Sequence, residues 1–217
     1  MGAHYRKIEQ HLGLIDDGDW LEIGVDRGEG STKFFAEQAG ERGVDFVGVD
    51  IDPDQIALAT KNCSIDGALS PHINLVTSKG EDYLASQHGT DRKFSLVYLD
   101  NFDWDYWLDV PDEGFVPAQR AKYPGLLNVP MMNINSELTH LVQAINMMSL
   151  LTPNCVVVCD DTWVEPRDGI FIGKCAAALP FLLTQGFKVE ETYGYRNRDG
   201  GSGAILSRST KTQTITL

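Results

Sequence analysis

Three aspartates stand where buried strands are expected to end, and together they could bind a cation. Asp100 follows the apolar run SLVYL, and Asp160 and Asp161 follow VVVC. Ligands collect at the carboxyl ends of the strands in an open parallel sheet. Three clustered carboxylates are unfavourable unless a cation is bound, and oxygen ligands suit Mg²⁺, Mn²⁺ or Ca²⁺ better than zinc. The pattern predicts a divalent metal site. The alternative is that Asp161 caps the next turn through Thr162 and that Asp100 only faces a ligand.

A glycine-rich turn near the N-terminus could bind a nucleotide. The segment DWLEIGVDRGEGS (19–31) is an expected strand that runs into a turn with three glycines, Gly24, Gly28 and Gly30. A helix is expected from about Ser31, and FVGVDID (46–52) is a second expected strand that ends in Asp50. This order is that of a βαβ nucleotide-binding unit, in which the acid can accept hydrogen bonds from ribose hydroxyls.

Glu22 indicates which nucleotide the turn suits. Dinucleotide sites use G-x-G-x-x-G and place a pyrophosphate at the helix N-terminus. Here the glycines are spaced G-x-x-x-G-x-G, and Glu22 stands two residues before the first of them. An anion would repel a pyrophosphate but attract the amino group of an amino-acid-bearing nucleotide, so the turn favours S-adenosylmethionine over NAD. The alternative is a solvated carboxylate at a strand end.

Further candidates for chemistry follow Asp100 in the segment NFDWDYW (101–107). Phe102 or Trp104 could stack on a flat adenine or form a wall for an aromatic substrate. Asp103 is expected at the same end of the sheet, as a candidate base or as a ligand of a second metal ion. His140, on the helix before the fifth expected strand, is the other titratable candidate, although a lone helical histidine is more often a core or surface residue.

The order of the expected elements predicts how these residues are positioned. Strands are expected at 20–23, 46–49, 73–77, 94–99, 155–159, 187–192 and 204–207. Helices are expected at 5–14, 32–39, 53–63, 81–87, 136–151 and 172–185. Alternation of this kind predicts an α/β, Rossmann-like three-layer sandwich in a single domain, 1–217. The last two strands are too close for a helical crossover, so we expect a seven-stranded, mostly parallel sheet with an antiparallel C-terminal hairpin.

One segment, 108–135, interrupts the alternation. It holds four of the nine prolines and little periodicity, but it is rich in apolar residues. Long irregular segments inside a domain are usually functional or disordered. The apolar content favours a lid over a substrate, with a contact between subunits of a homo-oligomer as the alternative.

The composition limits the classes of partner. The formal net charge is −13, from 18 basic and 31 acidic residues, and this opposes binding to a phosphate backbone. No run approaches the roughly 20 apolar residues of a membrane span, and no signal peptide is evident. The four cysteines form no CxxC pair and are expected to be reduced core thiols of a cytoplasmic protein: Cys63, Cys155, Cys159 and Cys175.

These motifs together resemble class I S-adenosylmethionine-dependent methyltransferases, in particular the metal-dependent O-methyltransferases, a group that includes catechol-type and macrolide-sugar tailoring enzymes. The resemblance covers about 20–207. LEIGVDRGEGS looks like the family's first motif. GVDID is similar to the ribose-binding strand end, SKGEDYL to the adenine-edge motif, and LVYLDNFDW and VVVCDDTW to the two metal-bearing strand ends. The resemblance implies cofactor contacts at Asp50, Ile51, Gly80, Glu81, Asp82, Asp100 and Phe102, and metal ligands at Asp100, Asp160 and Asp161.

The chain departs from this family at the general base. Relatives place Lys or His three residues after the first metal ligand, and this chain has Asp103 there. A free aspartate is a weak base for a hydroxyl, but a metal-bound hydroxyl is a stronger acid, so Asp103, water or His140 could accept the proton. We expect a divalent-metal-dependent O-methyltransferase of a phenol, a sugar or another small natural product. The alternatives are an NAD-dependent oxidoreductase and a non-catalytic cofactor-binding protein.

Overall fold

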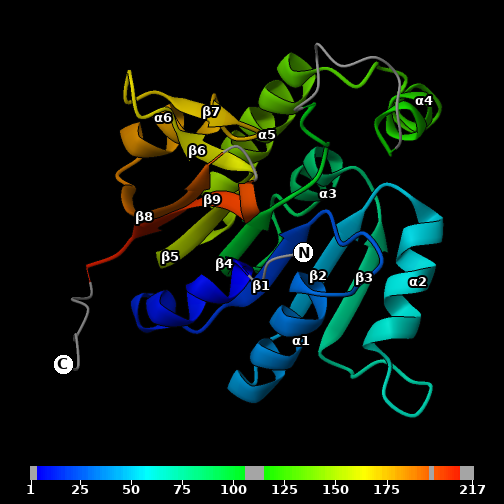
Figure 1. Cartoon of the computed structure of the whole chain (residues 1–217). Coiled ribbons are helices and arrows are strands. Elements are labelled where there is room, and N and C mark those ends of the chain that lie inside the picture. Colours follow the sequence, from blue (N-terminus) through cyan, green and yellow to red (C-terminus); the bar gives the residue numbers. More distant parts are fainter. Residues whose placement is uncertain (1–3, 106–114, 196–197, 211–217) are drawn as a thin grey trace.

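The computed structural model describes residues 4–105, 115–195 and 198–210. Its elements follow in chain order and are drawn in Figure 1: η1 (His4–Leu14), β1 (Asp19–Ile23), α1 (Ser31–Arg42), β2 (Phe46–Asp50), α2 (Pro53–Cys63), β3 (Ile73–Thr77), α3 (Gly80–Ser86), β4 (Phe94–Leu99), α4 (Phe115–Leu127), α5 (Asn133–Met147), η2 (Met148–Leu150), β5 (Leu151–Asp160), β6 (Thr162–Val164), β7 (Phe171–Gly173), α6 (Ala178–Thr184), β8 (Lys188–Tyr195) and β9 (Arg198–Arg208).

The main sheet confirms the predicted topology. Within the described residues it has seven strands in the order β3-β2-β1-β4-β5-β9-β8. The pairs from β3 to β5 are parallel, whereas β9 pairs antiparallel with both β5 and β8. The order reverses direction between β1 and β4, which is the kind of switch point where ligands bind in doubly wound sheets.

Both faces of the sheet are covered, as Figure 1 shows, and each has its own hydrophobic core. Alternate side chains of a strand point to opposite faces. On one face Leu21 and Ile23 of β1 pack with residues of α3, α5 and α6. On the other face Trp20 packs with η1 and α1, whose Phe35 is fully buried. This three-layer arrangement fixes the carboxyl ends of β1, β2, β4 and β5 at one edge.

The structure corrects two predictions about elements. Residues 172–177 were expected to begin a helix, but β7 pairs with β6 in a separate two-stranded antiparallel sheet, and α6 begins only at Ala178. The apolar run around Phe171 fits either element when it is read without its partner strand. The segment 108–135 was expected to be irregular, yet 115–127 forms α4 with Pro124 inside it. Its residues 108–114 lie outside the described part.

Two smaller features bear on the class of protein. The four cysteines are free and buried, as expected. Among the helices that the structure describes, none combines the length and the apolar character that crossing a membrane requires.

Candidate functional site

A cavity of about 740 Å³ opens at the carboxyl ends of the parallel strands, and it brings together most of the predicted site. Cavities of roughly 300–1,000 Å³ hold small molecules and cofactors. The predicted site residues that line it are Gly24, Gly30, Ser31, Asp50, Ile51, Gly80, Glu81, Asp100, Phe102, Asp103, Asp160 and Asp161. The turn after β1, the end of β2 and the start of α3 therefore face the same space as the acids after β4 and β5.

Glycines shape the turn between β1 and α1, but not all of them face the cavity. Gly24 has a φ of +100°, and a Cβ there would lie 2.6 Å from Asn101 N, so glycine allows the turn to pack on the end of β4. Gly28 was predicted to approach the ligand. It instead packs on α2, where a Cβ would lie 2.5 Å from Ala59 Cα, and it does not line the cavity. Gly30, with a φ of +75°, begins α1 on the cavity side.

Asp50 is held in place by backbone amides at the end of β2. The amides of Asp52 and Asp26 donate to its carboxylate, at 2.9 Å and 3.3 Å. Burial raises the pKa of Asp50 although these hydrogen bonds oppose the shift. Its neighbour Asp52 accepts a hydrogen bond from Asp54 N, caps α2 and forms an ion pair with Lys122 of α4, Nζ to Oδ2 2.7 Å. The Asp50 carboxylate is thus held in place and still has lone pairs that could accept hydrogen bonds from ribose hydroxyls.

Glu22 does not reach the wall of the cavity, contrary to the expectation from its spacing. Its side chain is fully buried beside the start of α1, and among the described residues neither carboxylate oxygen has a well-aligned hydrogen-bond partner. Burial raises the pKa of Glu22 to about 8, although the Ser31 and Thr32 side chains oppose this shift. The physical reason is the alternation along β1, which points Glu22 to the same face as Trp20. Contact of Glu22 with a cofactor stays a prediction.

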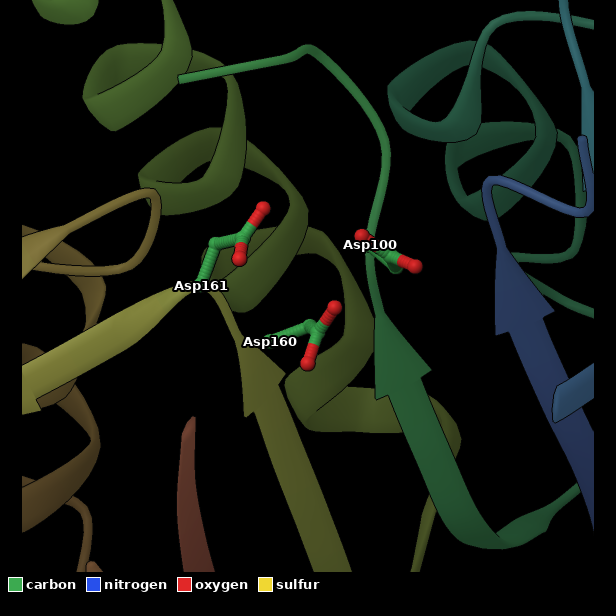
Figure 2. A group of neighbouring side chains, drawn as sticks. All are labelled: Asp100, Asp160 and Asp161. Carbon is green, nitrogen blue, oxygen red and sulfur yellow. The ribbon is translucent and has the colours of Figure 1, made fainter. Parts of the chain in front are cut away.

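The three predicted metal ligands do converge, as Figure 2 shows. Asp100 follows β4, Asp160 ends β5 and Asp161 begins the turn to β6. One oxygen of each carboxylate lies within 4.8 Å of the others. The Thr162 hydroxyl donates to the Asp160 carbonyl oxygen at 2.9 Å. Asp161 has a φ of +46°, a conformation that costs a non-glycine residue about 1 kcal/mol or more and often marks a functional site.

The side chain of Lys174, which the sequence did not suggest, enters this carboxylate cluster. Its Nζ lies 2.7 Å from Asp100 Oδ1 and 3.1 Å from Asp161 Oδ2. Nζ also donates to the Asp100 carbonyl oxygen at 3.2 Å. The Lys174 side chain is 2% exposed. The cluster already contains a cation that is supplied by the chain itself.

The charges of the cluster follow from this arrangement. Burial opposes the charged form of Lys174, but Asp100 and Asp161 outweigh it and hold the pKa of Lys174 well above its ordinary value. Burial, followed by the negative charges of Asp100 and Asp161, raises the pKa of Asp160 well above its ordinary value. The pKa of Asp100 is also raised by burial, and Lys174 opposes that shift. The cluster therefore combines a buried ammonium group with carboxyl groups, which are residue types that can exchange protons with a bound hydroxyl.

Helix α4 closes one side of the cavity. Its residues Lys122, Tyr123, Leu126 and Leu127 line the space. The Tyr123 hydroxyl accepts a hydrogen bond from the Asp103 backbone amide, and the Tyr123 ring packs edge-on against Phe102 at a centroid distance of 4.6 Å. Phe102 has a φ of +50° and lines the cavity, whereas Trp104 packs edge-on against Trp163. The aromatic candidate that faces the cavity is therefore Phe102.

Besides Glu22 and Gly28, two further predicted residues lie apart from the cavity. His140 is fully buried in α5; its Nδ1 lies 2.7 Å from the Ser136 carbonyl oxygen, and its Nε2 has no hydrogen-bond partner within the part of the chain that the structure describes. Burial lowers the pKa of His140 to about 3, which makes it a poor proton acceptor at neutral pH. Asp82 is exposed on α3. Neither residue lines the cavity, because each side chain leaves its helix on another side.

The residues that sequence reasoning missed are Lys174, Lys122 and Tyr123. A weak signal was present for Lys174, because a lysine in the apolar run GIFIGKC (169–175) is unusual and needs a partner when it is buried. No comparable signal marked Lys122 or Tyr123. Their segment has no strong periodicity, and their contacts with Asp52 and Asp103 depend on how α4 folds back over the sheet.

Comparison with known proteins establishes the fold. A scan against protein-family models found no match, and a search of the curated proteins found none either. Among solved structures, an O-methyltransferase from Bacillus cereus in complex with S-adenosylhomocysteine is 14% identical, with a TM-score of 0.57 over 96% of this chain and 80% of that one. TomG from Streptomyces achromogenes, an O-methyltransferase of tomaymycin synthesis in complex with S-adenosylmethionine, is 13% identical, with a TM-score of 0.56 over 96% and 79%.

A third structure, named as a candidate rRNA methylase from Clostridium thermocellum, is 16% identical, with a TM-score of 0.56 over 94% of each chain. One of these names refers to tomaymycin synthesis and another to rRNA. At such identities the likeness shows the fold alone. The chain has the Rossmann-like fold of S-adenosylmethionine-dependent methyltransferases.

Proposed function

We propose that this protein transfers a methyl group from S-adenosylmethionine to a hydroxyl group of a small molecule. The observation that carries the proposal is that two sets of residues meet in one cavity. One set is the nucleotide-binding turn with Asp50 and Gly80, and the other is the carboxyl cluster after β4 and β5. Structural neighbours with the same fold are O-methyltransferases in complex with S-adenosylhomocysteine or S-adenosylmethionine.

The residues of the cavity fit the parts of this cofactor. Asp50 would accept hydrogen bonds from the ribose, and Phe102 with the Gly80–Glu81 start of α3 would hold the adenine. The turn at Gly24 and Gly30 would hold the amino-acid end. At Gly80 a Cβ would lie 2.4 Å from Ile23 Cγ2, so glycine allows α3 to begin close against the end of β1. When it is bound, S-adenosylmethionine supplies a methyl group on a sulfonium, which an oxygen can attack in line as the carbon–sulfur bond breaks.

The protein's contribution to the transfer would be positioning and charge. Holding two reactants in line can lower the barrier by several kcal/mol, of the order of 7–11 in favourable cases. The acceptor hydroxyl would lie against the carboxyl groups of Asp100, Asp103 and Asp161, one of which would take its proton. Helix α4 would cover both reactants, since Tyr123 and Leu127 line the same space, and the exclusion of water favours loss of charge from the sulfonium.

A small acceptor is favoured over nucleic acid by charge. The formal net charge is −13, and the cavity receives acidic side chains from β2, β4 and β5. A phosphate backbone would be repelled by this surface. We propose that the acceptor is a phenol, a sugar or another small natural product. RNA should also be tested as a substrate, because one structural neighbour is named as a candidate rRNA methylase.

Divalent-metal dependence, which the sequence predicts, is not part of the proposed reaction. The oxygen atoms of Asp100, Asp160 and Asp161 are the right type for Mg²⁺, and they lie close enough together to share an ion. The buried ammonium group of Lys174 opposes the binding of a further cation, because it already contacts two of the three carboxylates. No step of the proposed reaction is therefore assigned to a metal.

Binding and turnover test the proposed function separately. S-adenosylhomocysteine should raise the unfolding temperature, and NADH should not. Transfer of a labelled methyl group should then be measured on phenols, catechols, sugars and an RNA pool. Stabilisation by NADH alone would indicate an oxidoreductase instead. Binding of S-adenosylhomocysteine without transfer to any acceptor would favour the non-catalytic cofactor-binding alternative.

Self-association through 108–135 is a separate proposal. It is supported by the exposed apolar side chains of Val129 and Met132, which continue into a row on α5, namely Ile134, Leu138, Val142 and Ile145. Light scattering coupled to gel filtration should show a dimer that Met132→Glu dissociates. A monomer at micromolar concentration would contradict it.

A further inference from the structure

The ammonium group of Lys174 occupies the space that a divalent ion would need. It lies 2.7 Å from Asp100 Oδ1 and 3.1 Å from Asp161 Oδ2. Carboxylate oxygens that bind Mg²⁺ or Ca²⁺ lie about 2.0–2.6 Å from the ion. An ion on the same carboxylates would therefore share a small, largely buried space with a like charge. It could bind only if the side chain moved away or lost its charge.

Three oxygen atoms surround the ammonium group of Lys174. An ammonium group has three N–H donors, and Nζ has three oxygen neighbours, which are Asp100 Oδ1, Asp161 Oδ2 and the Asp100 carbonyl oxygen. A buried charge is tolerated when it is paired and hydrogen-bonded, and Lys174 meets both conditions. The side chain is 2% exposed, so its charge is shielded from bulk solvent.

The backbone fixes Lys174 at this place. Gly173, the residue before it, has a φ of +111°, and a Cβ there would lie 2.0 Å from the Asp161 carbonyl oxygen. The Lys174 amide donates to the same oxygen at 3.1 Å. Glycine is thus required for the end of β7 to touch the turn that carries Asp161. The hairpin of β6 and β7 therefore places the backbone of Lys174 next to the carboxyl groups.

We propose that Lys174 is the resident cation of the carboxyl cluster and that it takes the place of a divalent metal ion. It neutralises and orients Asp100 and Asp161 at the wall of the cavity. The catalytic part of this statement rests on the proposed function: methyl transfer at this site requires no divalent ion. The binding part rests on the geometry of Lys174 alone, and it holds whatever the acceptor is.

Mn²⁺ binding tests the binding part directly. Chelator-treated protein would be titrated with Mn²⁺ and followed by electron paramagnetic resonance and by thermal unfolding, with and without S-adenosylhomocysteine. We expect no saturable site in the wild type. Lys174→Met removes the charge and keeps the length, so it should lower the unfolding temperature and create one saturable Mn²⁺ site. Mn²⁺ should then raise the unfolding temperature of the variant again.

Lys122→Met is the matched control. Lys122 also lines the cavity and forms an ion pair with an aspartate, Asp52, but it lies outside the cluster of three. This variant should gain no Mn²⁺ site. One saturable Mn²⁺ per wild-type chain, lost in Asp160→Asn, would overturn the proposal. A folded Lys174→Met protein without a new site would also overturn it, and if that variant does not fold, the wild-type titration decides.

Turnover tests the catalytic part. Once an acceptor is known, methyl transfer should continue undiminished after exhaustive treatment with EDTA. Loss of turnover that Mg²⁺ restores would overturn the metal-free mechanism. Failure to find any acceptor would contradict the proposed function but would not affect the result of the Mn²⁺ titrations. Failure of the proposed function can therefore be distinguished from failure of the proposal about Lys174.

Discussion

The Nζ atom of Lys174 lies 2.7 Å from Oδ1 of Asp100, although the two residues are 74 positions apart in the chain. Asp100 follows a central strand of the main sheet, and Lys174 follows a hairpin outside it. The pair joins these two parts of the fold at the wall of the cavity. It also sets the charge of the carboxyl cluster, which makes it the first target for mutation.

We expect strong energetic coupling between Lys174 and Asp100. Lys174→Met should lower the free energy of unfolding by about 3–5 kcal/mol, because removal of one partner leaves buried charge uncompensated. The double variant with Asp100→Asn should lose less than the sum of the two single losses, by about 0.5–3 kcal/mol. Urea unfolding of the four proteins of the cycle measures this. The exposed pair Lys33 and Glu37, 4.0 Å apart, should show little coupling, and equal coupling in both cycles would contradict the prediction.

Asp50 should matter for cofactor binding, and Asp82 should not. Asp50→Asn removes a charged acceptor from the cavity wall, and hydrogen bonds to charged groups contribute about 1.5–3 kcal/mol. The affinity for S-adenosylhomocysteine should fall roughly tenfold to a hundredfold. Asp82→Asn is the matched control because this carboxylate is exposed and outside the cavity. Calorimetric titration measures both, and an equal loss in the two variants would show that the cavity is not the cofactor site.

Glu22 should make the ligand-free protein less stable as the pH rises. Its pKa is about 8 in the folded protein and 4.5 ordinarily. Between these values the folded state holds a proton that the unfolded state has released. Stability should therefore fall with rising pH, by up to about 1.4 kcal/mol per pH unit from this group. Glu22→Gln should remove this contribution, as measured by urea unfolding at several pH values between 6.5 and 8. An unchanged slope would contradict the prediction.

Cofactor binding should release a proton from Glu22 if the amino group of the cofactor stabilises its charged form. At pH 7 the carboxyl group is protonated in the free protein, since its pKa is about 8. Calorimetric titration of S-adenosylhomocysteine in buffers of different ionisation enthalpy would detect the release. The release should be absent in Glu22→Gln. Equal proton release from both proteins would show that Glu22 does not sense the cofactor.

His140 should make the protein less stable as the pH falls. Burial lowers its pKa from 6.5 to about 3, so between these values the unfolded state binds a proton that the folded state does not. Stability should fall as the pH decreases below 6.5, by up to about 1.4 kcal/mol per pH unit. His140→Gln should remove this contribution. In NMR spectra the imidazole resonances of His140 should not shift between pH 5 and 8. Titration of these resonances near pH 6.5 would contradict the prediction and make His140 a candidate base again.

Much of the architecture could be predicted from local patterns. The parallel strands are short apolar runs separated by helical segments, and this alternation predicts a covered parallel sheet. The expected bounds of Ile73–Thr77 and Phe94–Leu99 match the structure. The pairing of Phe171–Gly173 with Thr162–Val164 was missed, because three-residue strands are stabilised by their partner and by packing rather than by their own sequence.

The sequence by itself determined the fold and the meeting of the three aspartates. Both follow from the order of the elements, since acids at the ends of adjacent parallel strands must share an edge of the sheet. Only the tertiary structure decided that Glu22 and His140 lie behind the cavity wall and that Lys174 enters the cluster. Burial and the pairing of charges are sums of contacts between segments far apart in the chain, and no local pattern records them.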